Sequence, residues 1–141
     1  MLDLFAGSGA LGLEALSRGA ASCLFVDLAQ AARSAIETNI RTLSLTARTS
    51  VAPFDAARLG APPRGTRFDL AFLDPPYGQG LDEAALARLA RHDWLEAGAI
   101  VIVERGAAEA SLAAPDFETL DVRAWGAAQI HFLRRGSAPA E

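Results

Sequence analysis

Gly7-Ser8-Gly9-Ala10-Leu11-Gly12 matches the pattern G-x-G-x-x-G letter for letter. This stretch follows residues 1–5, which are apolar apart from Asp3, and it leads into a helix-like pattern over residues 10–17. Glycines at these positions allow a tight turn between a strand and a helix, and they let the backbone approach a ligand closely. The sequence therefore predicts a strand, a glycine-rich turn and a helix at the beginning of an α/β sheet.

Strand and helix patterns alternate through the rest of the chain, which predicts a doubly wound, mostly parallel sheet. Two strand patterns around Trp125-Gly126 predict a closing antiparallel hairpin. One helix is expected to face the core with Ile36, Ile40 and Leu43. Together with the first strand at residues 1–5, these patterns predict seven strands in a Rossmann-like α/β fold. The other strands are expected at residues 22–26, 48–53, 68–73, 99–103, 117–124 and 129–134, the other helices at 29–43 and 81–91, and a loop at 58–67.

Length and composition limit the class of protein. The chain has 141 residues, 51% of them hydrophobic, so one folded domain is expected, and no apolar run approaches the roughly 20 residues of a membrane helix. The only cysteine, Cys23, excludes an intrachain disulfide, fits a reducing cytoplasm and is expected in the core. One cysteine and two separated histidines offer no metal site. The net charge of −4 disfavours a protein that binds nucleic acid over its whole surface, although a local basic patch would be enough.

A second informative stretch is Asp74-Pro75-Pro76-Tyr77, which follows the apolar run 70–73 and precedes Gly78. Each proline fixes φ, lacks an N–H donor and disfavours a helical conformation in the residue before it. The turn is therefore stiff, and it presents a carboxylate, outward carbonyls and an aromatic ring. An ionised carboxylate can only accept hydrogen bonds. Such a turn suits an amine on a flat ring, because carboxylate and carbonyl accept its two N–H groups while Tyr77 stacks on the ring.

Two acidic residues bear on the ligand of the glycine-rich turn. Asp27 lies twenty residues after Gly7, which is the spacing of the acidic residue that binds ribose hydroxyls. Its alternative role is to cap the helix that begins near Ala29. Asp3 lies inside the first strand, where a carboxylate suits the ammonium group of S-adenosylmethionine and would repel a pyrophosphate. The glycine pattern alone also fits a nicotinamide dinucleotide, which is the alternative cofactor.

Three further carboxylates have two interpretations each. Asp55 either caps a short helix from Ala56 or accepts a hydrogen bond from an adenine amino group, with Phe54 packed nearby. Glu104, at the end of the fifth strand, is expected to pair with an arginine rather than to take part in catalysis. Glu14, in the first helix, would either reach the amino-acid end of the cofactor or remain in solvent.

Residues 72–77 resemble the (Asn/Asp)-Pro-Pro-(Tyr/Phe) motif of methyltransferases that act on exocyclic or amide nitrogens. Residues 3–20 and 72–78 together resemble the bacterial 16S ribosomal RNA guanine-N2 methyltransferases (RsmD-like), and the resemblance runs to about residue 135. It implies the class I methyltransferase fold, S-adenosylmethionine as cofactor, and a guanine of 16S ribosomal RNA or the small ribosomal subunit as target; we also expect a monomer. By the resemblance, the cofactor is held by Asp3, Gly7, Gly9, Asp27 and Asp55, with Phe54 beside them, and the target base by Asp74, Pro75 and Tyr77.

The resemblance departs at the front of the chain. Family members carry an additional segment with basic residues before the first strand, whereas Met1 here lies inside that strand. We therefore expect a methyltransferase domain over residues 1–135 without that segment, followed by a frayed tail over 136–141. Binding of RNA is expected to be weak, because phosphates would lack those basic partners.

Three other functions fit part of the pattern. A DNA adenine-N6 methyltransferase would share the Asp-Pro-Pro-Tyr turn. A module that binds the cofactor without catalysing would share the glycine-rich turn and would lack transfer to ribosomal RNA. A nicotinamide-dependent oxidoreductase would share the glycine-rich turn and differ in the cofactor that binds.

Overall fold

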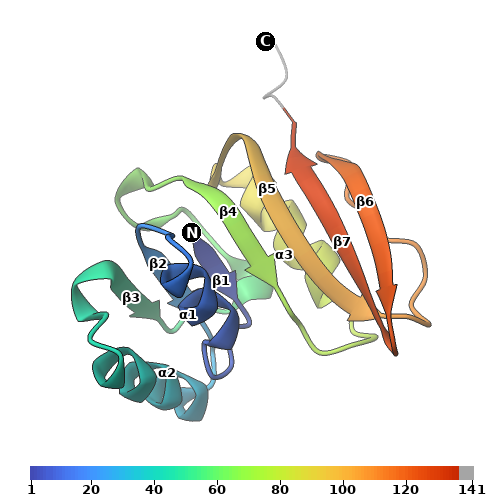
Figure 1. The fold of residues 1–141 in the computed structure, drawn as a ribbon. Coiled ribbons are helices and arrows are strands. Elements are labelled where there is room, and N and C mark those ends of the chain that lie inside the picture. Colours follow the sequence, from blue (N-terminus) through green and yellow to red (C-terminus); the bar gives the residue numbers. More distant parts are fainter. Residues whose placement is uncertain (137–141) are drawn as a thin grey trace.

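Seven strands form one mixed sheet in the computed structural model, which describes residues 1–136. The strand order is β3-β2-β1-β4-β5-β7-β6, with β1 to β5 parallel, β7 antiparallel to β5, and β6 antiparallel to β7 (Figure 1). The predicted doubly wound α/β fold with a C-terminal hairpin is therefore confirmed. The strands are β1 Leu2–Leu4, β2 Cys23–Val26, β3 Thr49–Ala52, β4 Phe68–Leu73, β5 Leu95–Gly106, β6 Phe117–Trp125 and β7 Ala128–Arg135.

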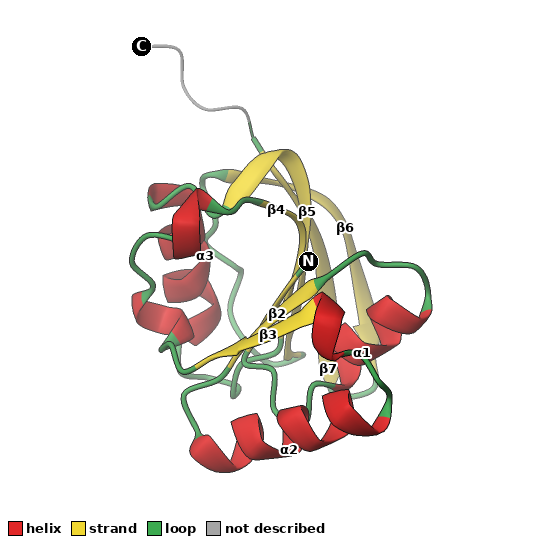
Figure 2. Cartoon of the chain, turned by 90° about the vertical axis from the view of Figure 1, so that its left-hand side faces the viewer, coloured by secondary structure: helices red, strands yellow, loops and turns green. Residues whose placement is uncertain are grey.

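Helices cover both faces of the sheet. Figure 2 shows α1 (Ala10–Ser17) and α2 (Gln30–Thr42) on one side, and α3 (Leu81–Arg91) on the other. None of the helices in the described part of the chain is long and apolar enough to cross a membrane. The sheet separates two hydrophobic clusters. The α1–α2 side buries Met1, Leu16, Cys23, Phe25, Ile36 and Ile40, and the α3 side buries a larger set that includes Leu2, Leu4, Val26, Leu73, Leu86, Leu89, Trp94, Val101 and Val103.

Three details differ from the sequence predictions. β5 extends beyond the predicted residues 99–103 at both ends. Leu95 pairs with Phe68 of β4, and the later residues pair with β7 from Ile100↔Arg134 to Gly106↔Ala128. Leu43 does not face the core with Ile36 and Ile40; it is the residue after the last turn of α2 and is 55% exposed. The predicted loop over 58–67 contains short 3₁₀ turns. These turns are η2 Ala56–Arg58 and η3 Pro63–Gly65, while η1 Thr46–Arg48 precedes β3.

The expected tail over 136–141 falls almost entirely outside the part of the chain that the structure describes. Only Gly136 of that segment is described, and its N–H donates to the carbonyl of Asp116 at 3.3 Å. The sheet itself ends at Arg135 in β7.

Gly12 brings α1 into close contact with the sheet. A Cβ atom at this position would lie 2.5 Å from Cε1 of Phe25 and 2.9 Å from Sγ of Cys23. Its N–H donates to Oδ2 of Asp3 at 3.0 Å, which ties the first turn of α1 to the middle of β1. Burial raises the pKa of Asp3 to about 7, against the opposing effect of this N–H. The glycine pattern therefore positions α1 as well as allowing the turn before it.

We predict that Gly12→Ala destabilises the fold by about 1–3 kcal/mol, because the added methyl group overlaps the fully buried ring of Phe25. The measurement is the free energy of unfolding in urea. Gly60→Ala is the matched control, since a Cβ there meets nothing within 4 Å and the backbone is not in the left-handed region. Equal stability of Gly12→Ala and the parent would contradict this account of the contact.

Candidate active site

A cleft of about 480 Å³ lies where the carboxyl ends of β1, β2 and β4 meet. In a parallel α/β sheet, ligands bind at this edge, next to the point where the strand order reverses. One residue here has an unusual backbone: Phe5 has a φ of +57°, a conformation that costs free energy for a residue with a side chain. The cleft is lined by Phe5, Asp27, Asp74, Pro75, Pro76 and Tyr77.

Asp27 holds two loops together at one wall of the cleft. Its Oδ2 accepts the N–H of Gly7 and its Oδ1 accepts the N–H of Ala29, each at 2.9 Å. Ala29 is the N-cap residue of α2, so Asp27 does not occupy the cap position that the alternative interpretation gave it. A carboxylate has about four acceptor positions, so two backbone bonds leave capacity for hydroxyl donors. Its predicted role with a ribose is therefore compatible with its structural role.

The opposite wall of the cleft joins β4 to β5. Leu73, the last residue of β4, pairs with Val103, so the next residues, Asp74 and Glu104, lie beside each other. The hydroxyl of Tyr77 donates to Oε2 of Glu104 at 3.0 Å. Partial burial, a hydrogen bond with Glu104 and the charge of Glu104 together raise the pKa of Asp74 to about 6. Two carboxyl groups and a tyrosine therefore meet at this wall.

The expectation that Glu104 pairs with an arginine is wrong. The arginine that follows it, Arg105, pairs instead with Asp82 at the start of α3. Neighbouring side chains on a strand point to opposite faces of the sheet, so Glu104 and Arg105 cannot share a partner. Glu104 is thereby left on the side of β5 that faces Tyr77, and sequence reasoning missed it as a site residue.

Arg105 is the centre of a clamp behind the Asp-Pro-Pro-Tyr turn. It is 5% exposed, and its Nε donates to Oδ2 of Asp82 at 2.5 Å. Its Nη1 donates to the carbonyl of Ala110 at 2.6 Å, and its Nη2 lies 3.9 Å from Oε1 of Glu109. Glu109 accepts the N–H of Gly106 at 2.5 Å and the N–H of Gly78 at 2.9 Å. These bonds join β5, α3 and the turn into one unit.

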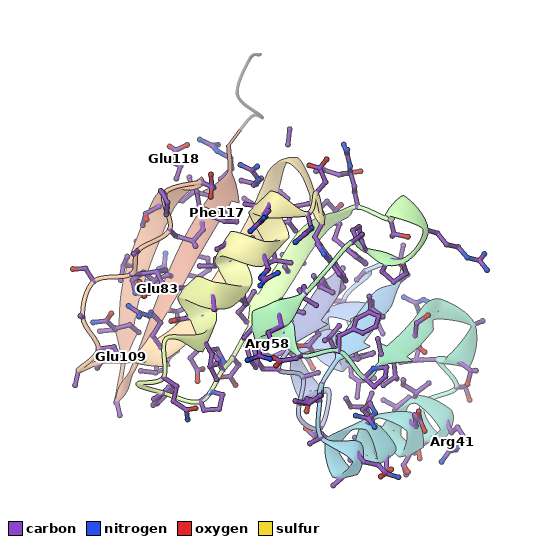
Figure 3. The ribbon with its side chains drawn as sticks, turned by 180° about the vertical axis from the view of Figure 1, so that it is seen from behind. Arg41, Arg58, Glu83, Glu109, Phe117 and Glu118 are labelled. Atoms are coloured by element: carbon purple, nitrogen blue, oxygen red, sulfur yellow. The ribbon has the colours of Figure 1, made fainter. Side chains whose placement is uncertain are left out.

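The loop after β5 is also tied directly to α3. The N–H of Ala113 donates to the carboxylate of Glu83 in the first turn of the helix. Figure 3 shows Glu83 and Glu109 on this side of the molecule. Sequence reasoning missed this clamp, although a charged residue at the end of an apolar strand and two acidic residues at a helix start were visible signals.

Of the six predicted cofactor residues, Asp27 lines the cleft, and the other five lie away from its lining. Asp3 is 1% exposed and sits beneath the glycine-rich turn. Gly9 is the left-handed residue that begins α1, with a φ of +83°. Asp55 accepts the N–H of Ala57 at 3.0 Å, which confirms its capping role. Phe54 packs edge-on against Trp94, at 6.5 Å between ring centres. The cofactor roles of these residues remain predictions.

Gly7, in the glycine-rich turn, and Glu14, in α1, are the two remaining predicted residues. Gly7 has a φ of +59° and open space around its Cα, as a residue facing a ligand would. Glu14 accepts a hydrogen bond from Nε of Arg18 at 2.7 Å on the exposed face of α1. Of the two interpretations of Glu14, the structure therefore shows the one in which the side chain remains in solvent.

Comparison with known proteins identifies the family. Residues 1–134 match the model of a family described as conserved hypothetical protein 95. The chain belongs to this family. Its curated relatives include the proposed rRNA methyltransferase YlbH of Bacillus subtilis, 43% identical over 105 residues. They also include the ribosomal RNA small subunit methyltransferase D of Haemophilus influenzae, 36% identical over 105 residues. The predicted resemblance to the RsmD-like proteins is confirmed.

The family match also extends to solved structures. The proposed methylase HI0767 of Haemophilus influenzae superimposes with a TM-score of 0.86 at 29% identity, covering 96% of this chain and 86% of that chain. The sequence alignments to the two curated relatives cover 73% of this chain but only 57% and 54% of those proteins. The chain thus spans little more than half the length of these family members.

We predict that Arg105→Ala lowers the free energy of unfolding by about 3–5 kcal/mol, because it leaves Asp82 buried without its partner. Arg67→Ala is the matched control: Arg67 pairs with Asp93 on the surface, where both side chains are more than half exposed, and its loss should cost less than about 1 kcal/mol. Chemical denaturation measures both. Similar losses in the two variants would show that the clamp does not stabilise the fold.

Proposed function

We propose that this chain is the catalytic part of an S-adenosylmethionine-dependent methyltransferase that modifies the exocyclic N2 amine of a guanine in 16S ribosomal RNA. One observation carries the proposal: the Asp-Pro-Pro-Tyr turn and Asp27 face each other across a single cleft. The turn provides acceptors for an amine, and Asp27 provides acceptors for a ribose. The names of the family members, which describe ribosomal RNA methyltransferases, agree with this combination.

The charges around the cleft fit a cationic cofactor without phosphates. Asp27 and Asp74 line it, and Glu104 lies behind Tyr77. S-adenosylmethionine supplies a methyl group bound to a positively charged sulfur, so carboxylates attract it, whereas the pyrophosphate of a nicotinamide dinucleotide would be repelled. The remaining acceptor positions of Asp27 suit the ribose hydroxyls. Asp3 is buried and accepts the N–H of Gly12, so we assign it the positioning of the glycine-rich turn instead of the predicted direct contact with the ammonium group.

The acceptor side positions the amine. The carboxylate of Asp74 and the carbonyl of Pro75 would accept its two N–H groups, which turns the nitrogen lone pair out of conjugation with the ring. Asp74 would also take the proton that the amine releases as the N–C bond to the methyl group forms and the methyl–sulfur bond breaks, with the sulfur leaving as a neutral thioether. Much of the rate enhancement would come from this positioning and from the preset charges.

Tyr77 would hold the base on its open side. The side chain is 48% exposed, and its ring rests against Gly106. Stacking of a base on an aromatic ring contributes about 1–3 kcal/mol. Access to the amine from this side requires a single-stranded or flipped-out guanine. Because the net charge is −4, affinity for RNA has to come from such local contacts or from parts of a longer protein.

The test is transfer of a labelled methyl group to small ribosomal subunits that lack the modification, followed by identification of the modified nucleoside. We expect N2-methylguanosine from the parent and a loss of at least about a hundredfold in Asp74→Ala. Asp69→Ala, which changes an exposed residue of the same strand, should behave as the parent. Calorimetry should show S-adenosylmethionine binding in all three proteins. Binding of NAD in its place, or methylation of adenine, would refute the proposal.

We also predict that the rate of transfer falls as the pH drops through about 6. Partial burial and the neighbouring Glu104 raise the pKa of Asp74 to about 6, and only the ionised carboxylate can take the proton that the amine releases. The carboxylate is therefore lost below this pH and retained above it. The rate is measured at saturating cofactor, so that changes in cofactor affinity do not contribute. A flat profile through this range would contradict the role of Asp74.

A further inference from the structure

We propose that Glu104 is the residue that selects guanine, by accepting a hydrogen bond from the ring N1–H next to the amine that Asp74 holds. This inference rests on the proposed methyltransferase function and adds a residue that determines its specificity. It begins from the place of Glu104 in the fold. Glu104 follows the last β4–β5 pair, Leu73↔Val103, and so lies beside Asp74. Asp74 and Tyr77 line the cleft, and Glu104 is joined to this lining through the hydroxyl of Tyr77.

The contact with Tyr77 determines how Glu104 is presented. The Tyr77 hydroxyl donates to Oε2 at 3.0 Å, which holds that oxygen of the carboxylate toward the tyrosine ring. The ring proposed to stack on the base therefore also orients the carboxylate beside it. Asp74 adjoins Glu104, because the residues before them, Leu73 and Val103, pair across β4 and β5. The pair thus forms a compact double acceptor at the edge of the stacking surface.

A double acceptor of this kind matches only one edge among the four bases. Guanine presents two adjacent donors on its Watson–Crick edge, the N2 amine and the N1–H. Adenine and cytosine present an amine next to a ring nitrogen with a lone pair, which would face the carboxylate of Glu104. A site with fixed polar groups rejects a ligand that leaves them unpaired far more strongly than one that merely fills less space.

The acceptors of the Asp-Pro-Pro-Tyr turn do not by themselves explain a preference for guanine. Asp74 and the Pro75 carbonyl would accept an exocyclic amine from guanine or adenine equally well. Discrimination therefore requires a group that contacts the ring atom next to the amine. Among the described residues, Glu104 is the side chain that both contacts Tyr77 and adjoins Asp74.

The experiment removes the N1–H of the target base together with the carbonyl oxygen at C6, so the comparison of the parent with Glu104→Gln isolates the contact to N1. The guanine identified in the transfer assay is exchanged for 2-aminopurine by ligating a synthetic segment into the small-subunit RNA. This base keeps the N2 amine but carries a lone pair at N1. The parent should methylate guanine at least about tenfold faster than 2-aminopurine. In Glu104→Gln the preference should disappear, because an amide can both accept from N1–H and donate to the lone pair.

Glu96→Gln makes the same chemical change at the other end of β5, where the side chain is exposed, and should keep the preference of the parent. Cofactor affinity and thermal stability confirm that each variant is folded. An undiminished preference in Glu104→Gln would overturn the inference. Loss of transfer to both bases with intact cofactor binding would also overturn it, because Glu104 would then act in catalysis in general.

The parent protein alone provides an independent check that needs no variant. Equal rates on guanine and 2-aminopurine would refute the proposed role of Glu104 and would not affect the proposed function. Absence of transfer to either base would instead refute the proposed function. The two failures are therefore distinguishable.

Discussion

The close approach of α1 to the sheet at Gly12 is the constraint on which the rest of the structure depends. The missing side chain lets the helix contact Phe25, and the Gly12 N–H bonds to the buried Asp3 of β1. This contact determines the path of the turn between β1 and α1. Asp27 then accepts from Gly7 in that turn, which connects the end of β2 to the same structure. One wall of the cleft is therefore a direct extension of the core.

The other wall has a different origin, because side chains distant in sequence build it. Arg105 and Glu109 hold the Asp-Pro-Pro-Tyr turn from behind, through Asp82 and the N–H of Gly78. A buried ion pair costs desolvation and is weak evidence for stability, but it specifies one arrangement of β5, α3 and the turn. The turn thereby has a rigid support on the side away from the ligand. Such support suits a reaction that depends on placing an amine accurately.

The two walls together explain why the site contains more carboxylates than the motif alone supplies. Two backbone N–H groups occupy part of the acceptor capacity of Asp27. Asp74 and Glu104, by contrast, lie beside each other and receive few hydrogen bonds. The first arrangement suits hydroxyl groups, and the second suits a base with two adjacent donors. A cation placed between the walls would be attracted by both. The chemistry of the site is thus a property of the pairing of β2, β1, β4 and β5.

The sequence by itself determined the elements whose ends are marked by glycine, proline or a change of period. It predicted the bounds of α1, β4 and α3 to the residue and the glycine-rich turn, because these depend on local backbone preferences. Only the tertiary structure decided the length of β5 and the partner of Glu104. β5 is extended by pairing with β7, and the direction of Glu104 depends on which face of the strand its neighbour Arg105 occupies. Contacts between residues twenty or more positions apart follow from packing, which no local pattern specifies.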